Sequence, residues 1–336
     1  KRLAQIAGSR DWDIVWYNNV SLVGGPGIME YGKRAATNGL RIYEAHEHWL
    51  VCPSHVLWRY NKELCDRREC LRCVLSYRRP PQLWRQTGLL DRELSQIDMI
   101  IAKSEFSRAK HAEFGLRHPM TVLPYFLPDL DHSATSPAQH DAPYFLFVGR
   151  LEKIKGLQDV FPAMDRYPDA ELLILGDGDY ANELKAMAAH NSRIKFLGRK
   201  RPEELAAYYR GALGLIVPSV CYETFGIILI ESFRLGTPVI ARRLGPFPEI
   251  VERSAAGQLF ETEDDLIKAM GALQGDADTR AALSASARRA FEEVWREDQV
   301  LAAYGAALAG AAAAKGDLDL AKALEAGAFE NGAGPL

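Results

Sequence analysis

The sequence contains no hydrophobic run that approaches the ~18–20 residues a membrane-spanning helix requires. It also has no strong excess of either charge, because 41 lysines and arginines stand against 44 aspartates and glutamates, for a net charge of −3. Such a balance gives no reason to expect bulk nucleic-acid binding. We therefore predict a protein with no transmembrane segment and no nucleic-acid partner.

Cysteine is scarce outside one segment. The chain has five cysteines, and four of them lie between Cys52 and Cys73. A secreted disulfide framework is typical of much smaller chains. We therefore expect a cytoplasmic protein, with peripheral association at the inner face of a membrane, through a partner, as an alternative.

The remaining composition is that of an ordinary globular protein, with 48% hydrophobic and 25% charged residues. A length of 336 residues exceeds one ordinary core and predicts about two domains. Residues 128–143 are rich in Ser, Pro, His, Asp and Ala, which indicates a linker. The expected parts are an N-terminal domain (1–130), a linker (131–143), a C-terminal domain (144–300), and a helix with an Ala/Gly-rich tail (301–336).

Short apolar runs alternate with helical patterns in both predicted domains, which predicts an α/β protein with two doubly wound parallel sheets. The expected strands are 13–17, 40–45, 99–102, 121–123, 144–148, 171–175, 194–197, 213–217 and 239–241. After residue 241 we expect mainly helix, to about residue 313. Two such domains should face each other across a cleft, which is the usual place for a small-molecule site.

The segment 217–241 joins an expected strand to a helix and carries two carboxylates. Glu223 is expected in the loop, and Glu231 about two turns into the helix. Gly226, near the helix start, leaves backbone N–H groups available to an anion such as phosphate. The alternative for both glutamates is a solvated helix face.

A second loop, after the expected strand 144–148, carries Gly149, Arg150 and Lys155. The glycine lets a ligand approach the backbone, and the two cations suit phosphate oxygens. By itself this loop is equally consistent with a solvated basic turn. Because both loops follow strands of one sheet, we predict a phosphate site.

The ordered set of motifs resembles the retaining glycosyltransferases of family four (glycosyl transferases group 1), which have the GT-B fold of two Rossmann-like domains. The resemblance rests on G-R-L at 149–151, K-G at 155–156, E-T-F-G at 223–226 and Glu231. Matching fragments at 218–219, 236–239 and 248–251 follow in the family's order. Together they cover residues 144–251.

The resemblance implies a role for each matched position. Arg150 and Lys155 would neutralise the diphosphate of a nucleotide-sugar donor, and the backbone from Gly226 onward would bind its distal phosphate. Glu231 would accept hydrogen bonds from the ribose, and Glu223 would act beside the reacting sugar. The other expected donor-site residues are Gly149, Ser219, Phe225, Ile227 and Ile228.

In the first domain, the string 45–53 resembles the family segment in which a histidine precedes an acid. His46 is followed by Glu47 and is the expected catalytic histidine, near the reacting sugar and the acceptor. His48 is the rival candidate. A histidine at a strand end is often only a satisfied polar residue.

The four clustered cysteines, Cys52, Cys65, Cys70 and Cys73, have spacings of twelve, four and two residues, and the last pair is C-x-x-C. Such thiols suit a structural tetrahedral zinc ion. A similar insertion is seen in some members of the family. Free thiols are an equal alternative, and an iron–sulfur cluster is a weaker one.

The family's first domain usually begins with further βα units and a glycine-rich loop ahead of the segment found here. We therefore expect the N-terminal domain to be incomplete, which affects the acceptor side and not the donor side.

The expected function is retaining, metal-independent transfer of a sugar from a nucleotide-diphosphate sugar to a hydroxyl of a glycan, glycolipid or small molecule. No cofactor is expected for catalysis. Two alternatives stay open, a sugar-nucleotide epimerase of the same fold and a non-catalytic nucleotide-sugar-binding subunit.

Overall fold

The structure is a computed structural model that describes residues 5, 8, 11–23, 25–129 and 136–327. The chain divides into two compact units. The first contains the chain up to Tyr125 together with Asp298–Leu336, and the second is Phe126–Glu297. The domain boundaries drawn from the sequence stay predictions.

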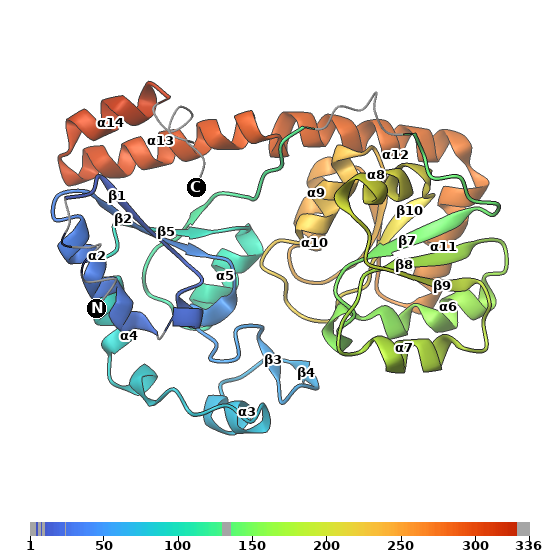
Figure 1. Ribbon diagram of the computed structural model, residues 1–336, viewed down its shortest axis with the longest axis horizontal. Helices are drawn as coiled ribbons and strands as arrows, with labels where there is room; N and C mark the ends of the chain where they lie inside the picture. Colours follow the sequence, from blue (N-terminus) through green and yellow to red (C-terminus); the bar gives the residue numbers. More distant parts are fainter. Residues whose placement is uncertain (1–4, 6–7, 9–10, 24, 130–135, 328–336) are drawn as a thin grey trace. The chain divides into compact units, whose positions relative to one another are not determined.

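The first unit contains a parallel sheet in the order β1-β2-β5-β6 (Figure 1). Its strands are short apolar runs, and every residue of β5 is buried. The strands are β1 (Ile14–Asn18), β2 (Leu40–Ala45), β5 (Met99–Ala102) and β6 (Thr121–Val122). The helices are η1 (Val20–Val23), η2 (Pro26–Ile28), α2 (Met29–Ala35), η3 (His48–Leu50), α4 (Leu89–Leu94), α5 (Glu105–Glu113), α13 (Glu297–Lys315) and α14 (Leu318–Glu325).

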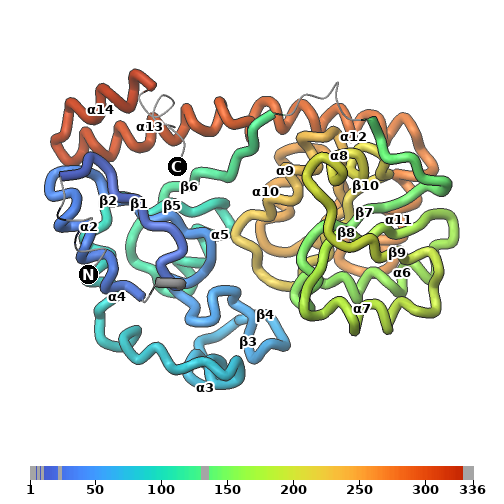
Figure 2. The backbone as a smooth tube through the Cα atoms, in the orientation of Figure 1, coloured from blue at the N-terminus to red at the C-terminus, as the bar shows by residue number. Residues whose placement is uncertain are grey.

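An insertion between β2 and α4 contains the clustered cysteines. It forms the antiparallel pair β3 (Trp58–Arg59) and β4 (Glu63–Leu64), then α3 (Cys70–Ser76) and η4 (Leu83–Gln86). Figure 2 shows this insertion at the end of the first unit opposite to α13 and α14.

The second unit has a six-stranded parallel sheet in the order β12-β11-β10-β7-β8-β9. Its strands are β7 (Tyr144–Val148), β8 (Glu171–Leu175), β9 (Ile194–Gly198), β10 (Gly214–Val217), β11 (Val239–Arg242) and β12 (Gly257–Phe260). Its helices are η6 (Lys153–Lys155), η7 (Leu157–Asp159), α6 (Phe161–Arg166), α7 (Ala181–Ala188), α8 (Pro202–Gly211), α9 (Ile227–Arg234), α10 (Phe247–Ser254), α11 (Glu263–Gly275), α12 (Ala277–Ala290) and η8 (Phe291–Trp295).

This strand order is that of a doubly wound Rossmann-type sheet. The central strands are almost fully buried, and Phe145, Leu172, Ile174, Ile216 and Ile240 share one apolar cluster with α11. Burial of such side chains is the main favourable contribution to the stability of the unit.

The nine predicted strands are present with ends shifted by one residue at most, so the predicted α/β class is confirmed. The prediction of mainly helix after residue 241 is wrong at β12, which pairs with the neighbouring strand β11. Its four residues include a glycine and a glutamine and have no clear apolar period. A Cβ on Gly257 would lie 2.3 Å from the Val239 carbonyl oxygen, so the close approach of the two strands requires glycine.

Candidate functional site

The candidate donor site lies where the strand order of the second unit reverses. From β7 the chain proceeds to β8 and β9 on one side, and from β10 to β11 and β12 on the other. β7 and β10 are neighbours with Gly214 beside Phe145. Ligands of such sheets bind beyond the carboxyl ends of the strands at this point. The two loops predicted from the sequence, 149–156 and 218–226, begin here.

The two loops are joined through their backbones. The Val220 N–H donates to the Ile154 carbonyl at 2.9 Å. Gly156 has φ of +70°, and a Cβ there would lie 2.0 Å from the Pro218 carbonyl oxygen. The second glycine of the basic loop is therefore required for the loop to pack against the end of β10.

Lys155 and Glu223 form an ion pair across the two loops. The Lys155 Nζ donates to Glu223 Oε1 at 2.6 Å, and the Ser219 hydroxyl donates to the same oxygen at 3.2 Å. Burial alone would lower the pKa of Lys155, but the Glu223 carboxylate outweighs burial and raises that pKa. Lys155 is therefore a fixed cation at neutral pH.

Arg150 lies differently from Lys155. Its side chain is 72% exposed and pairs with Glu152 at 2.6 Å, Nη1 to Oε1. The sequence placed both cations in one loop but gave no side-chain direction. In this structure Lys155 is held against Glu223, while Arg150 extends to solvent with a carboxylate of its own loop.

The helix α9 begins directly after a glycine. Gly226 is its N-cap, with φ of +96°, and no side chain caps this end. The first turn carries no acidic residue. A Cβ at Gly226 would lie 2.6 Å from Phe247 Cε1, so only glycine fits. An uncapped helix N-terminus is suited to an anion.

The other predicted donor-site residues surround this turn. Phe225 and Ser219 are buried, Ile227 is exposed and Ile228 is half-buried. Glu231 lies in the second turn of α9, closer to the start than the two turns expected.

Glu231 has a partner that sequence reasoning missed. The hydroxyl of Tyr209, a buried residue of α8, donates to Glu231 Oε2 at 3.3 Å. Burial raises the pKa of Glu231, while the Tyr209 bond and the charge of Arg234 act in the opposite direction. A tyrosine in a neighbouring helix gives no spacing signal in the sequence that would connect it with Glu231.

In the first unit, His46 follows β2 and is held at both ring nitrogens. Nδ1 contacts the Tyr125 hydroxyl at 2.5 Å, and Nε2 contacts Asn18 Oδ1 at 2.7 Å. Burial lowers the pKa of His46, with the Glu47 charge opposing it. The imidazole is therefore neutral at pH 7.

The sequence analysis also missed a buried lysine near His46. Lys103, which follows β5, is only 1% exposed and donates to Glu44 and, at 2.5 Å, to the Tyr304 hydroxyl. Burial lowers the pKa of Lys103 to about 7. Glu44 Oε2 lies 3.7 Å from His46 Nε2. The sequence could have indicated Lys103 through its position at the carboxyl end of a strand adjacent to β2.

His48, the rival to His46, is buried and packs its ring against that of His111, with centroids 5.1 Å apart. Ser104, which follows β5, caps α5 by accepting from the Ser107 N–H at 3.0 Å. His48 therefore has a packing role, and Ser104 has a capping role.

The four clustered cysteines line one small cavity of about 10 Å³. The Tyr60 N–H donates to Cys73 Sγ at 3.4 Å. Nevertheless, among residues 11–23, 25–129 and 136–327, no group of three or more His, Cys, Asp or Glu is arranged to hold a metal ion. The zinc site therefore stays a prediction from the spacing, and metal analysis of the purified protein would test it.

Comparison with known proteins relates the second unit to a glycosyltransferase family. Residues 130–290 match the family model described as "Glycosyl transferases group 1". The D-inositol 3-phosphate glycosyltransferase of Corynebacterium jeikeium is 35% identical over 153 residues, covering 41% of this chain and 36% of that protein. The sulfoquinovosyl transferase SQD2 of Arabidopsis thaliana is 29% identical over 167 residues, covering 48% of this chain and 32% of that protein.

Among solved structures, Anabaena HepE in complex with UDP is similar, with a TM-score of 0.65 and 18% identity over 89% of this chain and 78% of that chain. This similarity confirms the GT-B fold of two Rossmann-like units. The resemblance to group 1 glycosyltransferases is confirmed, because residues 130–290 match the model of that family.

The matches span about a third of the length of the two curated relatives. In the described part of the chain, no helix is both long enough and apolar enough to cross a membrane.

Proposed function

We propose that this chain is a retaining glycosyltransferase that takes its sugar from a nucleotide-diphosphate donor. The observation that carries the proposal is the Lys155–Glu223 pair, which joins the loops after β7 and β10 at the reversal of the strand order. A cation, an uncapped helix N-terminus and two carboxylates gather at this one edge of the sheet.

The diphosphate would be bound by Lys155 and by the backbone N–H groups at the start of α9. Arg150 would add a second cation by exchanging Glu152 for the phosphate, which its long exposed side chain allows. Cleavage of the sugar–phosphate bond leaves negative charge on the departing diphosphate. Fixed cations and helix N–H groups stabilise that charge, so we propose that catalysis needs no metal.

The two glutamates would bind different hydroxyl groups of the donor. Glu231, oriented by Tyr209, would accept hydrogen bonds from the ribose hydroxyls. Glu223 would accept from the sugar hydroxyls once the donor phosphate binds Lys155. His46, neutral and fixed at both nitrogens, would serve the acceptor side.

Retention would follow if the leaving diphosphate accepts the acceptor's proton on the face from which the donor bond breaks. In that order of events the acceptor oxygen forms the new bond to the anomeric carbon. The sugar–phosphate bond breaks, and the proton passes from the acceptor hydroxyl to the diphosphate.

The test compares Lys155→Ala with Lys185→Ala, which removes an exposed lysine from α7 of the same unit. We expect Lys155→Ala to lower donor turnover by roughly 10²-fold or more, because a fixed charge beside the leaving group is lost. Lys185→Ala should match the wild type. The readout is release of nucleoside diphosphate from a panel of nucleotide sugars, with acceptors present or absent.

Normal turnover in a well-folded Lys155→Ala protein would overturn the phosphate assignment. Conversion of the donor to an isomer without any acceptor would favour the epimerase alternative. Binding of the donor without turnover across several acceptors would favour a non-catalytic binding subunit.

A further inference from the structure

The cysteine-containing insertion exposes three leucines that no described element covers. Leu71 and Leu75 on α3 are 52% and 56% exposed, and Leu83 on η4 is 64% exposed. They are three of the seven large apolar side chains that the described residues expose, and they fall within thirteen residues of sequence. Exposed apolar side chains gathered in this way indicate an interaction surface.

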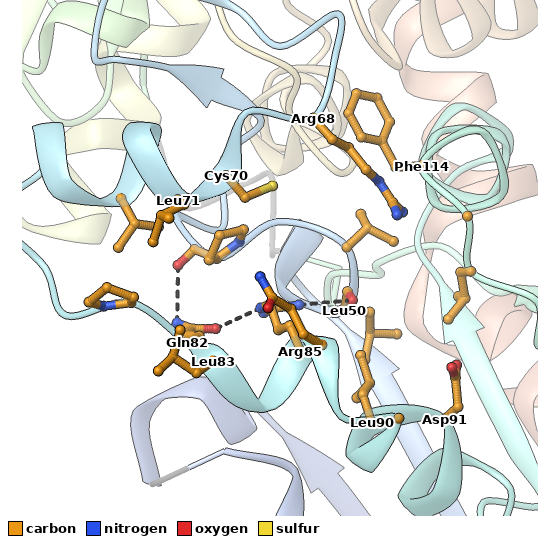
Figure 3. Close-up of a pocket in the computed structure, with 18 residues that line it drawn as sticks. Leu50, Arg68, Cys70, Leu71, Gln82, Leu83, Arg85, Leu90, Asp91 and Phe114 are labelled. Atoms are coloured by element: carbon orange, nitrogen blue, oxygen red, sulfur yellow. Dashed lines mark hydrogen bonds between the residues drawn. The ribbon is translucent and has the colours of Figure 1, made fainter.

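Leu71 shares a surface with each of the other two leucines. Leu71 and Leu75 are four residues apart and lie on one face of α3, while Cys73 and Val74 of the same helix are buried. Leu71 and Leu83 line a single pocket of about 270 Å³. Figure 3 shows them on one side of this pocket, with Arg68 and Phe114 on the other.

The segment that carries these leucines has an excess of positive charge. Residues 66–91 contain six arginines against three acids, Asp66, Glu69 and Asp91, in a chain whose net charge is −3. Asp91 lines the same pocket as Arg68, Leu71 and Leu83. Arg68 and Arg72 are exposed, and no described carboxylate forms an ion pair with either. Their charge is therefore available to a partner. We call Leu71, Leu75, Leu83, Arg68 and Arg72 the leucine–arginine patch.

We propose that the leucine–arginine patch docks this chain on the surface of an anionic phospholipid bilayer. The arginines would lie at the lipid phosphates, and the leucines would enter the boundary between headgroups and acyl chains. A soluble polyanion would use the arginines but would leave the leucines in water. The apolar half of the patch therefore favours a lipid surface. This docking goes beyond the proposed transfer reaction and does not depend on the donor site.

Vesicle co-sedimentation of the full chain tests the proposal. We expect binding to vesicles of phosphatidylcholine mixed with phosphatidylglycerol, little binding to phosphatidylcholine alone, and weaker binding as salt rises. The double variant Leu71→Ser/Leu75→Ser should bind about tenfold more weakly or worse. Arg68→Gln/Arg72→Gln should lose about fivefold for each arginine removed.

The matched control is Met187→Ser/Leu318→Ser, which removes two exposed apolar side chains from α7 and α14. It should bind vesicles as the wild type does, and unchanged melting temperatures would show that all variants fold. Absence of binding to the anionic vesicles would overturn the proposal, as would equal binding by the leucine variant. Binding to heparin that survives the leucine replacements, with no vesicle binding, would assign the patch to a soluble polyanion instead.

Discussion

Lys155 and Glu223 come from different loops and neutralise each other in the structure, 2.6 Å apart. A donor diphosphate would compete with the Glu223 carboxylate for the same ammonium group. When phosphate takes that position, the carboxylate becomes available to the hydroxyls of the sugar. At the scale of single residues, we therefore expect donor binding to switch one ion pair for another.

Gly226 provides a second test at this scale. Gly226→Ala should destabilise the protein by about 1–3 kcal/mol, because alanine at φ of +96° is strained and its Cβ meets the ring of Phe247. It should also weaken donor binding, since the start of α9 must shift. Urea unfolding and donor titration measure the two effects.

The control for that variant is Gly271→Ala, in the middle of α11, where an added Cβ meets nothing within 4 Å. This change should stabilise the protein by up to about 1 kcal/mol and leave donor binding alone. Wild-type donor affinity in Gly226→Ala would contradict a role for the α9 N-terminus.

The sequence predicted the positions of the site residues along the chain, but not their side-chain directions or their contacts with other helices. Lys155, Glu223 and Gly226 were placed together because each follows a strand of one parallel sheet. Side-chain direction was not predictable, as the exposed pair of Arg150 with Glu152 illustrates. Contacts such as Tyr209 with Glu231 join separate helices, so no local pattern could indicate them.

At the scale of elements, α13 is held to the first sheet by a polar cluster around Asp98. Lys315, at the end of α13, donates to Asp98 Oδ2 at 2.9 Å, and the Arg41 N–H donates to the same oxygen at 2.8 Å. Burial alone would raise the pKa of Asp98, but the bonds from Lys315 and Arg41 outweigh burial and lower it. The charged form of Asp98 therefore stabilises the folded state.

Asp98→Asn should lower the free energy of unfolding by about 1 kcal/mol at neutral pH, because an ion pair is lost while one acceptor oxygen remains. The folded pKa of Asp98 is below its unfolded value. Its stabilisation is thus present above the unfolded pKa and disappears as pH falls through the folded pKa. Urea unfolding at pH 7 and below about pH 4 should show the difference from wild type shrinking in acid. A difference independent of pH would contradict this account of the cluster.

The helices and strands themselves were largely predictable, because parallel strands are buried on both faces and therefore appear in the sequence as short continuous apolar runs. β12 was missed for the opposite reason. It is an edge strand of four residues with only one fully buried side chain, so its pairing with β11 and not its own composition determines its structure.

For the molecule as a whole, the two units resemble known proteins in different ways. The second unit matches the group 1 glycosyltransferases in sequence, whereas the first unit is similar to solved structures in fold. The proposed donor site uses residues of the second unit alone. Binding of a ligand at this site is therefore the part of the proposed function that can be measured most directly.

That measurement is thermal unfolding of the full chain with a panel of nucleoside diphosphates and nucleotide sugars. A ligand at a hundredfold excess over its Kd stabilises the folded state by about 2.7 kcal/mol, enough to shift the melting temperature by a few degrees. We predict such a shift for at least one nucleoside diphosphate in the wild type and in Lys185→Ala, and its loss in Lys155→Ala. No shift with any nucleoside diphosphate, or an equal shift in Lys155→Ala, would contradict the account.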